Sequence, residues 1–169
     1  KRVLSNESNA IKQLAKSLGK NYVDAIDKLD NVKGRVIFTG IGKSGHVARK
    51  MASTFSSTGV PSYFVHPSEA SHGDLGIIDH SDAVVVISNS GETPEISDLV
   101  EYTKRHKIPL ITITSNLDSL IAEQSDIALL LPKVKEACPM GLAPTTTTTM
   151  TMALGDAMAI NLMTRRNFS

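Results

Sequence analysis

The chain has 169 residues, of which 41% are hydrophobic and 4% aromatic, and its 18 Lys and Arg nearly balance its 17 Asp and Glu. This composition is typical of one globular domain and excludes a disordered or fibrous chain. The near-neutral charge gives no electrostatic argument for a nucleic-acid or membrane partner. The absence of Trp and the few aromatic residues disfavour stacking on single-stranded bases.

Cysteine content and hydropathy narrow the protein class further. The single Cys138 excludes an intrachain disulfide and a multi-cysteine zinc site, and it fits the reducing cytoplasm. We expect a packed thiol at this position, not a nucleophile, because no His is paired with it in the sequence. No apolar run approaches the roughly 20 residues that span a bilayer, and the chain opens on no signal-peptide pattern.

The first 33 residues are expected to be helical. Leu4, Ile11, Leu14 and Leu18 recur at roughly helical spacing. Gly19 either ends this helix or only interrupts it, because an apolar face continues from residue 22 to residue 29. The segment 30–34 is predicted to be a turn.

Beyond residue 34, short aliphatic runs alternate with amphipathic stretches. The predicted strands are Val36–Phe38, Tyr63–Val65, Ala83–Ile87, Leu110–Thr114 and Ile127–Leu131. The predicted helices are Gly45–Ser57, Glu95–His106, Ser119–Glu123 and Thr146–Met163. Strands that are apolar on both faces are typical of a parallel sheet covered by helices. We therefore expect a three-layer, doubly wound α/β fold with a five-stranded parallel sheet, as one domain over 1–169 with a helical segment 1–33 and a core 34–169.

A glycine-rich loop follows the first predicted strand. Thr39–Gly45 has the spacing G-x-G-x-x-G, but the acidic residue that dinucleotide binding needs about 20 positions later is missing. A Walker loop would require Gly where Ile37 stands. The remaining interpretation is a turn whose amides, Lys43 and Ser44 face an anion. The alternative is a glycine turn that only makes room for packing.

A second polar loop, Ser88–Thr93, follows the strand Ala83–Ile87. Thr93 is a candidate N-cap, with Pro94 as the first helical residue. Hydroxyl groups beside a helix N-terminus suit a phosphate group, although a plain capped turn would use the same residues. The Thr145–Thr149 tract is expected to open the last helix, and the sequence leaves open whether its hydroxyls serve packing or a ligand.

Four motifs together resemble a known family. They are GIGKSGH, SNSGETPEI, VKEACPMGLAPTTTTT and VHPSEASHGDLG. They are similar to the sugar isomerase (SIS) domain, and more closely to the D-arabinose 5-phosphate isomerases of Kdo biosynthesis, over residues 36–163. The resemblance implies a cytoplasmic homotetramer that interconverts D-ribulose 5-phosphate and D-arabinose 5-phosphate through an enediol, without a cofactor, and that supplies lipopolysaccharide biosynthesis.

The resemblance also implies roles for individual residues. The catalytic residues would be Lys43, Glu95, Glu136 and His72, with Glu136 as the base whose pKa an enclosed site would raise toward neutrality. Taken by itself, Glu136 would be a solvated loop residue. The residues expected to bind substrate or phosphate are Gly42, Ser44, Ser88, Asn89, Ser90, Thr93, Gly59 and Val60.

The resemblance also leads to expectations about metal binding, regulation and segments of the family that this sequence does not contain. His66 matches a metal position of the family, but one His is a poor ligand set, so we expect any metal there to be incidental or inhibitory. The sequence stops before the family's further catalytic His and before the CBS modules that many members carry. A nucleotide-sugar feedback ligand remains open. The alternatives are an isomerase of another sugar phosphate and a non-catalytic sugar-phosphate sensor, which the pair of carboxylates disfavours.

Overall fold

Five parallel strands form one sheet in the order β2-β1-β3-β4-β5. They are β1 (Val36–Gly40), β2 (Ser62–Phe64), β3 (Ala83–Ile87), β4 (Leu110–Thr114) and β5 (Ile127–Leu130). After β1 the chain forms β2 at one edge of the sheet, and the next strand, β3, lies on the opposite side of β1. The carboxyl ends of β1 and β3 therefore form the switch point at which open α/β sheets bind ligands.

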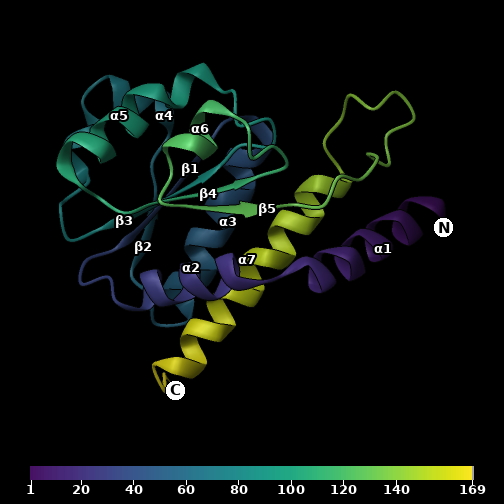
Figure 1. Ribbon diagram of the computed structural model, residues 1–169, viewed down its shortest axis with the longest axis horizontal. Coiled ribbons are helices and arrows are strands. Elements are labelled where there is room, and N and C mark those ends of the chain that lie inside the picture. Colours follow the sequence, from purple (N-terminus) through teal and green to yellow (C-terminus); the bar gives the residue numbers. More distant parts are fainter. Residues whose placement is uncertain (169) are drawn as a thin grey trace.

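The computed structural model describes residues 1–168 and has helices on both faces of the sheet (Figure 1). One face is covered by α1 (Arg2–Ser17), α2 (Lys20–Asp30), α3 (Gly42–Ser57) and α7 (Thr146–Arg165). The other is covered by α4 (Pro67–Ser71), α5 (Ser97–His106) and α6 (Leu120–Gln124). Two single 3₁₀ turns, η1 (Asp74–Ile77) and η2 (Pro94–Ile96), complete this layer.

Successive strand residues enter different cores, as expected for a sheet that is buried on both faces. Phe38 packs with α3 and α7, whereas Ile37 packs with the α4 and α5 layer. Val84 and Val85 divide in the same way. The predicted three-layer fold and its parallel sheet are thus confirmed.

The predicted helices are found with shifted ends. Gly19 does end the first helix, since α1 stops at Ser17 and Gly19 holds the N-cap position of α2. The helix predicted from Glu95 starts as η2 and becomes α-helical only at Ser97. Two elements, α4 and η1, were not predicted, and each of them is a single short turn. No helix among residues 1–168 combines the length and apolarity that crossing a membrane requires.

The outer edge of β5 is covered by α2. The Asn21 side chain donates a hydrogen bond to the carbonyl of Ala128 at 3.1 Å, and α2 packs against both β5 and α7. The N-terminal helices are therefore part of the fold and cover the strand at this end of the sheet.

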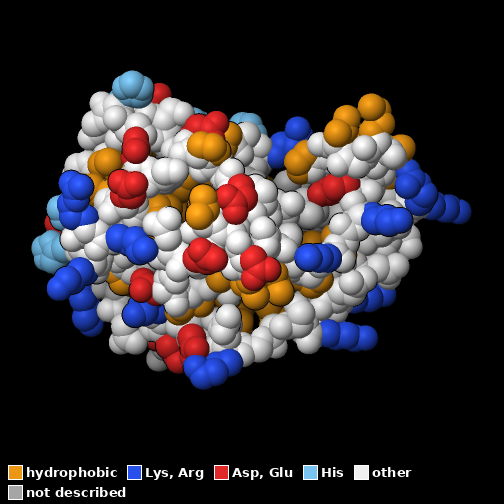
Figure 2. Space-filling model, turned by 45° about the horizontal axis from the view of Figure 1, so that its top comes forward, with side chains coloured by type: hydrophobic (Ala, Val, Ile, Leu, Met, Phe, Trp, Pro, Cys, Tyr) orange, Lys and Arg blue, Asp and Glu red, His pale blue; other side chains and the backbone are white. Residues whose placement is uncertain are grey.

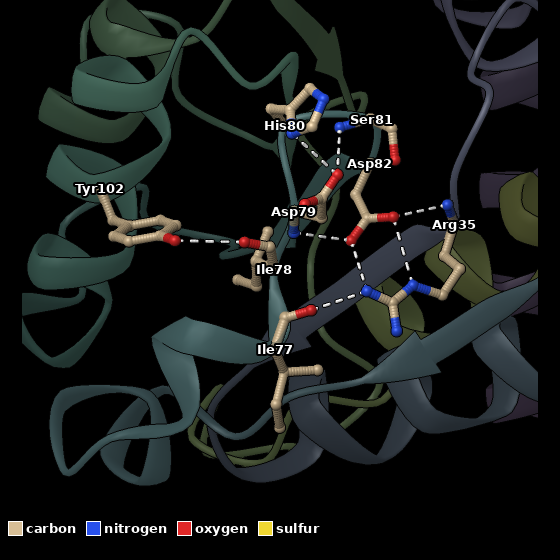
Figure 3. Close-up of polar contacts among 8 residues, drawn as sticks. All are labelled: Arg35, Ile77, Ile78, Asp79, His80, Ser81, Asp82 and Tyr102. Carbon is tan, nitrogen blue, oxygen red and sulfur yellow. Dashed lines mark hydrogen bonds and ion pairs between the residues drawn. The ribbon is translucent and has the colours of Figure 1, made fainter.

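A group of polar residues, here called the amino-edge cluster (Arg35, Asp79 and Asp82), joins the starts of β1 and β3 (Figure 3). Asp82 is 1% exposed and accepts hydrogen bonds from the backbone N–H and Nη2 of Arg35, at 2.7 and 2.8 Å, and from the amide of Asp79 at 2.9 Å. Burial alone would raise the pKa of Asp82, but these hydrogen bonds outweigh it and hold that pKa below its ordinary value. Both carboxylate oxygens of Asp82 thus accept hydrogen bonds within the cluster and are not available to a ligand.

Candidate active site

The glycines of the loop after β1 allow two backbones to approach closely. A Cβ on Gly45 would lie 2.6 Å from the carbonyl oxygen of Gly40, and one on Gly40 would lie 2.9 Å from that of Ile87. Gly42 has a φ of +57°, in the left-handed region that favours glycine. The packing interpretation therefore explains the glycine spacing.

The same loop also leaves helix amides free for an anion. No side chain caps α3, whose N-cap position is held by Ile41, so the first-turn N–H groups lack a side-chain acceptor. Ser44 in this turn lines a cavity, while the Lys43 side chain is exposed. Packing thus explains the glycines, and anion binding by the first-turn amides stays a prediction.

Hydroxyl groups hold the loop after β3 together from within. Ser88 is 3% exposed, and its Oγ lies 2.7 Å from the Thr93 hydroxyl and accepts a hydrogen bond from the Gly91 amide. The Asn89 side chain accepts one from Ser115 at 2.6 Å and borders the cavity. Ser90 accepts one from the Glu92 amide at 3.2 Å. Thr93 holds the expected N-cap position, but its hydroxyl bonds Ser88 instead of the helix.

Glu136 lies at the N-terminus of α7 and is held there by the threonine tract. Its Oε2 accepts hydrogen bonds from the backbone amides of Thr145 and Thr146, both at 2.7 Å, and the Thr147 hydroxyl donates to its Oε1. Partial burial works to raise the pKa of Glu136, but the bonds from Thr147 and Thr145 outweigh burial and lower it. The expectation of a raised pKa was therefore wrong, because the helix N-terminus stabilises the charged form.

A cavity of about 230 Å³ opens beside Glu136 at the carboxyl ends of the strands. Its walls come from the ends of β3 and β4, from α3, from α7 and from the loop between β5 and α7. The lining includes Ser44, Asn89, Leu131, Glu136, Thr147 and Thr151. The structure thus brings together three of the predicted site residues, Ser44, Asn89 and Glu136, from three distant parts of the sequence.

Several predicted residues lie outside this cavity. Lys43, Glu95 and His72 are exposed, and none of them lines it. His66 is the N-cap of α4, and its Nδ1 accepts a hydrogen bond from the Ser68 amide at 3.2 Å. Within residues 1–168, no group of three or more His, Cys, Asp or Glu residues could hold a metal ion.

Gly59 and Val60, which are predicted to contact the substrate, lie apart from this cavity in the single chain, and their role stays a prediction. They follow the C-terminus of α3 and precede β2, so they lie at the amino ends of the strands, on the opposite edge from the cavity. Gly59 has a φ of +85° and faces Phe168, and Val60 is 2% exposed. Both residues serve the turn that reverses the chain after the helix.

The loop between β5 and α7 holds features that the sequence analysis missed. Cys138 is half-buried instead of packed, and the backbone amides of Ala143 and Met140 lower the pKa of its thiol. Met140 is 76% and Leu142 74% exposed, and Figure 2 shows hydrophobic side chains gathered at the tip of this loop. The threonine donors to Glu136 were also missed, although a threonine tract just before a helix is a signal for capping.

Comparisons with known proteins show which family the chain belongs to. The SIS domain family matches residues 28–161. Arabinose 5-phosphate isomerase KdsD of Shigella flexneri is 48% identical over 169 residues, which are 100% of this chain and 52% of that protein. The chain thus spans about half the length of the curated relatives it matches.

Two solved structures have the same fold at substantial identity. The c3406 protein of E. coli CFT073, solved in complex with arabinose 5-phosphate, matches with a TM-score of 0.96 and 40% identity, covering 99% of this chain and 89% of that one. A putative phosphosugar isomerase involved in capsule formation from Bacteroides fragilis matches with a TM-score of 0.94 and 38% identity, covering 98% and 88%. The chain belongs to the SIS domain family.

Proposed function

We propose that this chain is the catalytic domain of an aldose–ketose isomerase that interconverts D-ribulose 5-phosphate and D-arabinose 5-phosphate. The observation that carries the proposal is the carboxylate of Glu136 on the wall of a cavity that is also lined by Ser44 at an uncapped helix N-terminus. A proton acceptor beside an anion-binding turn is what isomerisation of a sugar phosphate needs. The identity to KdsD over the whole chain and the arabinose 5-phosphate complex of the c3406 protein support this choice of substrate.

The proposed reaction is a proton transfer between neighbouring carbons. Glu136 removes the proton from the carbon next to the substrate carbonyl, which gives an enediolate, and returns it to the former carbonyl carbon, while the hydroxyl proton moves to the former carbonyl oxygen. The lowered pKa keeps this carboxylate in the charged, proton-accepting form at neutral pH. Carbon is neither oxidised nor reduced overall, so the chemistry requires no redox cofactor.

The substrate phosphate would be held at the start of α3. The first-turn amides of α3 carry the positive end of the helix dipole, and Ser44 adds a hydroxyl donor. Lys43, next in the chain to Ser44, is proposed to hold substrate oxygens. Asn89 on the facing loop supplies a further polar contact on the cavity wall.

Glu95 and His72 are proposed to act as the second carboxylate and a hydroxyl-binding group. Helix α4, whose C-cap is His72, packs against η2, which carries Glu95, so these two residues belong to neighbouring elements. Both side chains are exposed in a single chain. Four further proposals rest on the resemblance and on the KdsD relatives. They are a homotetramer, a cytoplasmic location, a nucleotide-sugar feedback ligand and a role in Kdo and lipopolysaccharide biosynthesis.

Isotope exchange tests the proposed reaction. The chain is incubated with D-arabinose 5-phosphate in deuterated water, and NMR follows both the appearance of D-ribulose 5-phosphate and the incorporation of deuterium at carbon. We expect both, and we expect Glu136→Gln to lose both while still binding the substrate. Binding without turnover in the unmodified chain would instead favour a sensor, and turnover of a hexose phosphate alone would favour a different isomerase.

A further inference from the structure

A second cavity, of about 410 Å³, lies between α1 and the segment that leads from β5 to Glu136. We call it the α1 cavity. Its lining residues are Asn6, Asn9, Ala10, Gln13, Lys133, Val134, Lys135 and Thr146. None of them lines the cavity beside Glu136, so the two cavities are separate.

The α1 face that lines this cavity is polar, with Asn6 half-buried and Asn9 and Gln13 exposed to solvent. Asn6, Asn9 and Gln13 are spaced so that they share one side of the helix, and all three line the cavity. Side-chain amides both donate and accept hydrogen bonds, which suits a ligand with several hydroxyl groups. This face of α1 therefore offers three amide side chains to a ligand in the cavity.

A buried hydroxyl without a partner lies on the opposite wall. Thr146 is 1% exposed, and its Oγ1 is one of two buried side-chain polar atoms within residues 1–168 that have no hydrogen-bond partner. Its neighbours differ, because the hydroxyls of Thr145 and Thr147 donate to Glu136 and that of Thr148 donates to a backbone carbonyl. A buried polar group is costly to leave unpaired, so a single unpaired member of this tract points to a partner that a ligand supplies.

The charges around the α1 cavity have one sign. Lys133 and Lys135 line it, and no acidic side chain does. We propose that the α1 cavity binds a polyol that carries one anionic group, either a carboxylate or a phosphate. The amides and the Thr146 hydroxyl bind its hydroxyl groups, and the lysines bind its charge.

This site is connected to Glu136 through the backbone. The amide of Thr146 donates to Glu136 Oε2 at 2.7 Å, and Lys135 directly precedes Glu136 in the chain. A ligand on Lys135 and Thr146 therefore contacts both segments that position the carboxylate. The α1 cavity is accordingly an effector site, and this role, unlike the binding itself, rests on the proposed function.

Calorimetry tests the binding without any need for activity. The chain is titrated with D-gluconate, with D-sorbitol 6-phosphate, which has no carbonyl to isomerise, and with neutral sorbitol. We expect one of the two anions to bind, and Lys133→Ala or Asn9→Ala to weaken it about tenfold. The matched control Lys12→Ala, on α1 but outside the cavity, is expected to change the affinity less than about twofold.

The outcomes are distinct. Tighter binding of gluconate assigns a carboxylate, and tighter binding of sorbitol 6-phosphate assigns a phosphate. Sorbitol binding equal to that of both anions overturns the proposed charge recognition. Affinities that are unchanged in Lys133→Ala and Asn9→Ala overturn the site, as does an affinity that is weakened only by Asn89→Ala, which would show that the probe binds in the cavity beside Glu136.

The effector role is tested by rate. We expect the bound anion to change kcat/KM for D-arabinose 5-phosphate in the unmodified chain, and Lys133→Ala to abolish that change. Binding with an unaltered rate overturns the effector role. A chain with no isomerase activity contradicts the proposed function, and the calorimetric result then still decides whether the site exists.

Discussion

The two edges of the sheet each hold a carboxylate with a lowered pKa, but they hold it by different means. At the amino edge Asp82 is buried and paired with the guanidinium of Arg35. At the carboxyl edge Glu136 is held by amides and hydroxyls of residues 145–147, without a cation among its hydrogen-bond partners, and it borders a cavity. A carboxylate paired with a cation within the fold joins elements together, whereas a charge stabilised only by dipoles remains available to a substrate.

The largest expected difference between the two edges is in catalysis. Glu136→Gln should lower kcat for D-arabinose 5-phosphate by about 10²- to 10⁴-fold, the range for loss of a general base. Asp82→Asn, on the far edge, should leave kcat near that of the unmodified chain wherever the variant is folded. Steady-state rates of both variants check this, and full activity of Glu136→Gln would contradict the assignment of the base.

The next largest effect is on stability, where we expect substitution of Asp82 to cost more than substitution of Glu136. Asp82→Ala removes a buried carboxylate whose partner, Arg35, is 33% exposed, and it should lower the free energy of unfolding by about 2 kcal/mol. Glu136→Gln removes a helix-capping charge that lies partly in solvent, and it should cost about 1 kcal/mol. Urea denaturation of both variants measures this, and equal losses would show that the two carboxylates have the same structural role.

The fold could be predicted largely from the sequence, because each buried strand is a run of aliphatic residues such as Ala83–Ile87. The site was predicted less completely. The position of Glu136 depends on Thr145 and Thr147, and hydrogen bonds between a loop and a helix end have no periodic signature. The substrate contact predicted for Gly59 stays a prediction, because a glycine that ends a helix has the same sequence signal as one that binds a ligand. The conformation of the Cys138 loop could not be read from residue types, since it depends on backbone amides.

Glycine substitutions compare how tightly the two edges are packed. A Cβ on Gly34 would meet Asp82 and would lie 2.8 Å from the backbone carbon of Ser81, so Gly34→Ala should cost about 2 kcal/mol through crowding. Gly42 has a left-handed φ but open space around it, so Gly42→Ala should cost about 1 kcal/mol through backbone strain alone. Thermal or urea unfolding measures the pair. A larger loss for Gly42→Ala would reverse the comparison.

Lowering the pH should destabilise the protein by protonating one carboxylate at each edge of the sheet, Asp82 and Glu136. The pKa values of Asp82 and Glu136 are lowered in the folded state, so the unfolded chain binds their protons first. The stability they contribute is present above the ordinary carboxyl pKa of about 4 and is lost as the pH falls through the lower, folded values. Urea midpoints between neutral pH and about pH 3 should fall, and Asp82→Asn should flatten that fall. If the urea midpoint of this variant falls with pH as steeply as that of the unmodified chain, Asp82 does not cause the pH dependence.

The smallest effect concerns Cys138, near Glu136. Backbone amides lower the pKa of its half-buried thiol, so iodoacetamide should alkylate it with a pH midpoint below the ordinary cysteine value of about 8.5. Mass spectrometry of the single cysteine follows the rate. A midpoint at or above that value would mean that the amides do not stabilise the thiolate in solution.

The Asn21 hydrogen bond to Ala128 has a consequence for self-association. β5 is the last strand of the sheet, and its outer backbone groups would offer a template on which another chain could add a strand. Helix α2 covers this edge, and Asn21 occupies one of its carbonyl groups. The helical segment before the sheet therefore protects the protein from edge-to-edge aggregation, and a fragment that begins at β1 would lose that protection while keeping every strand.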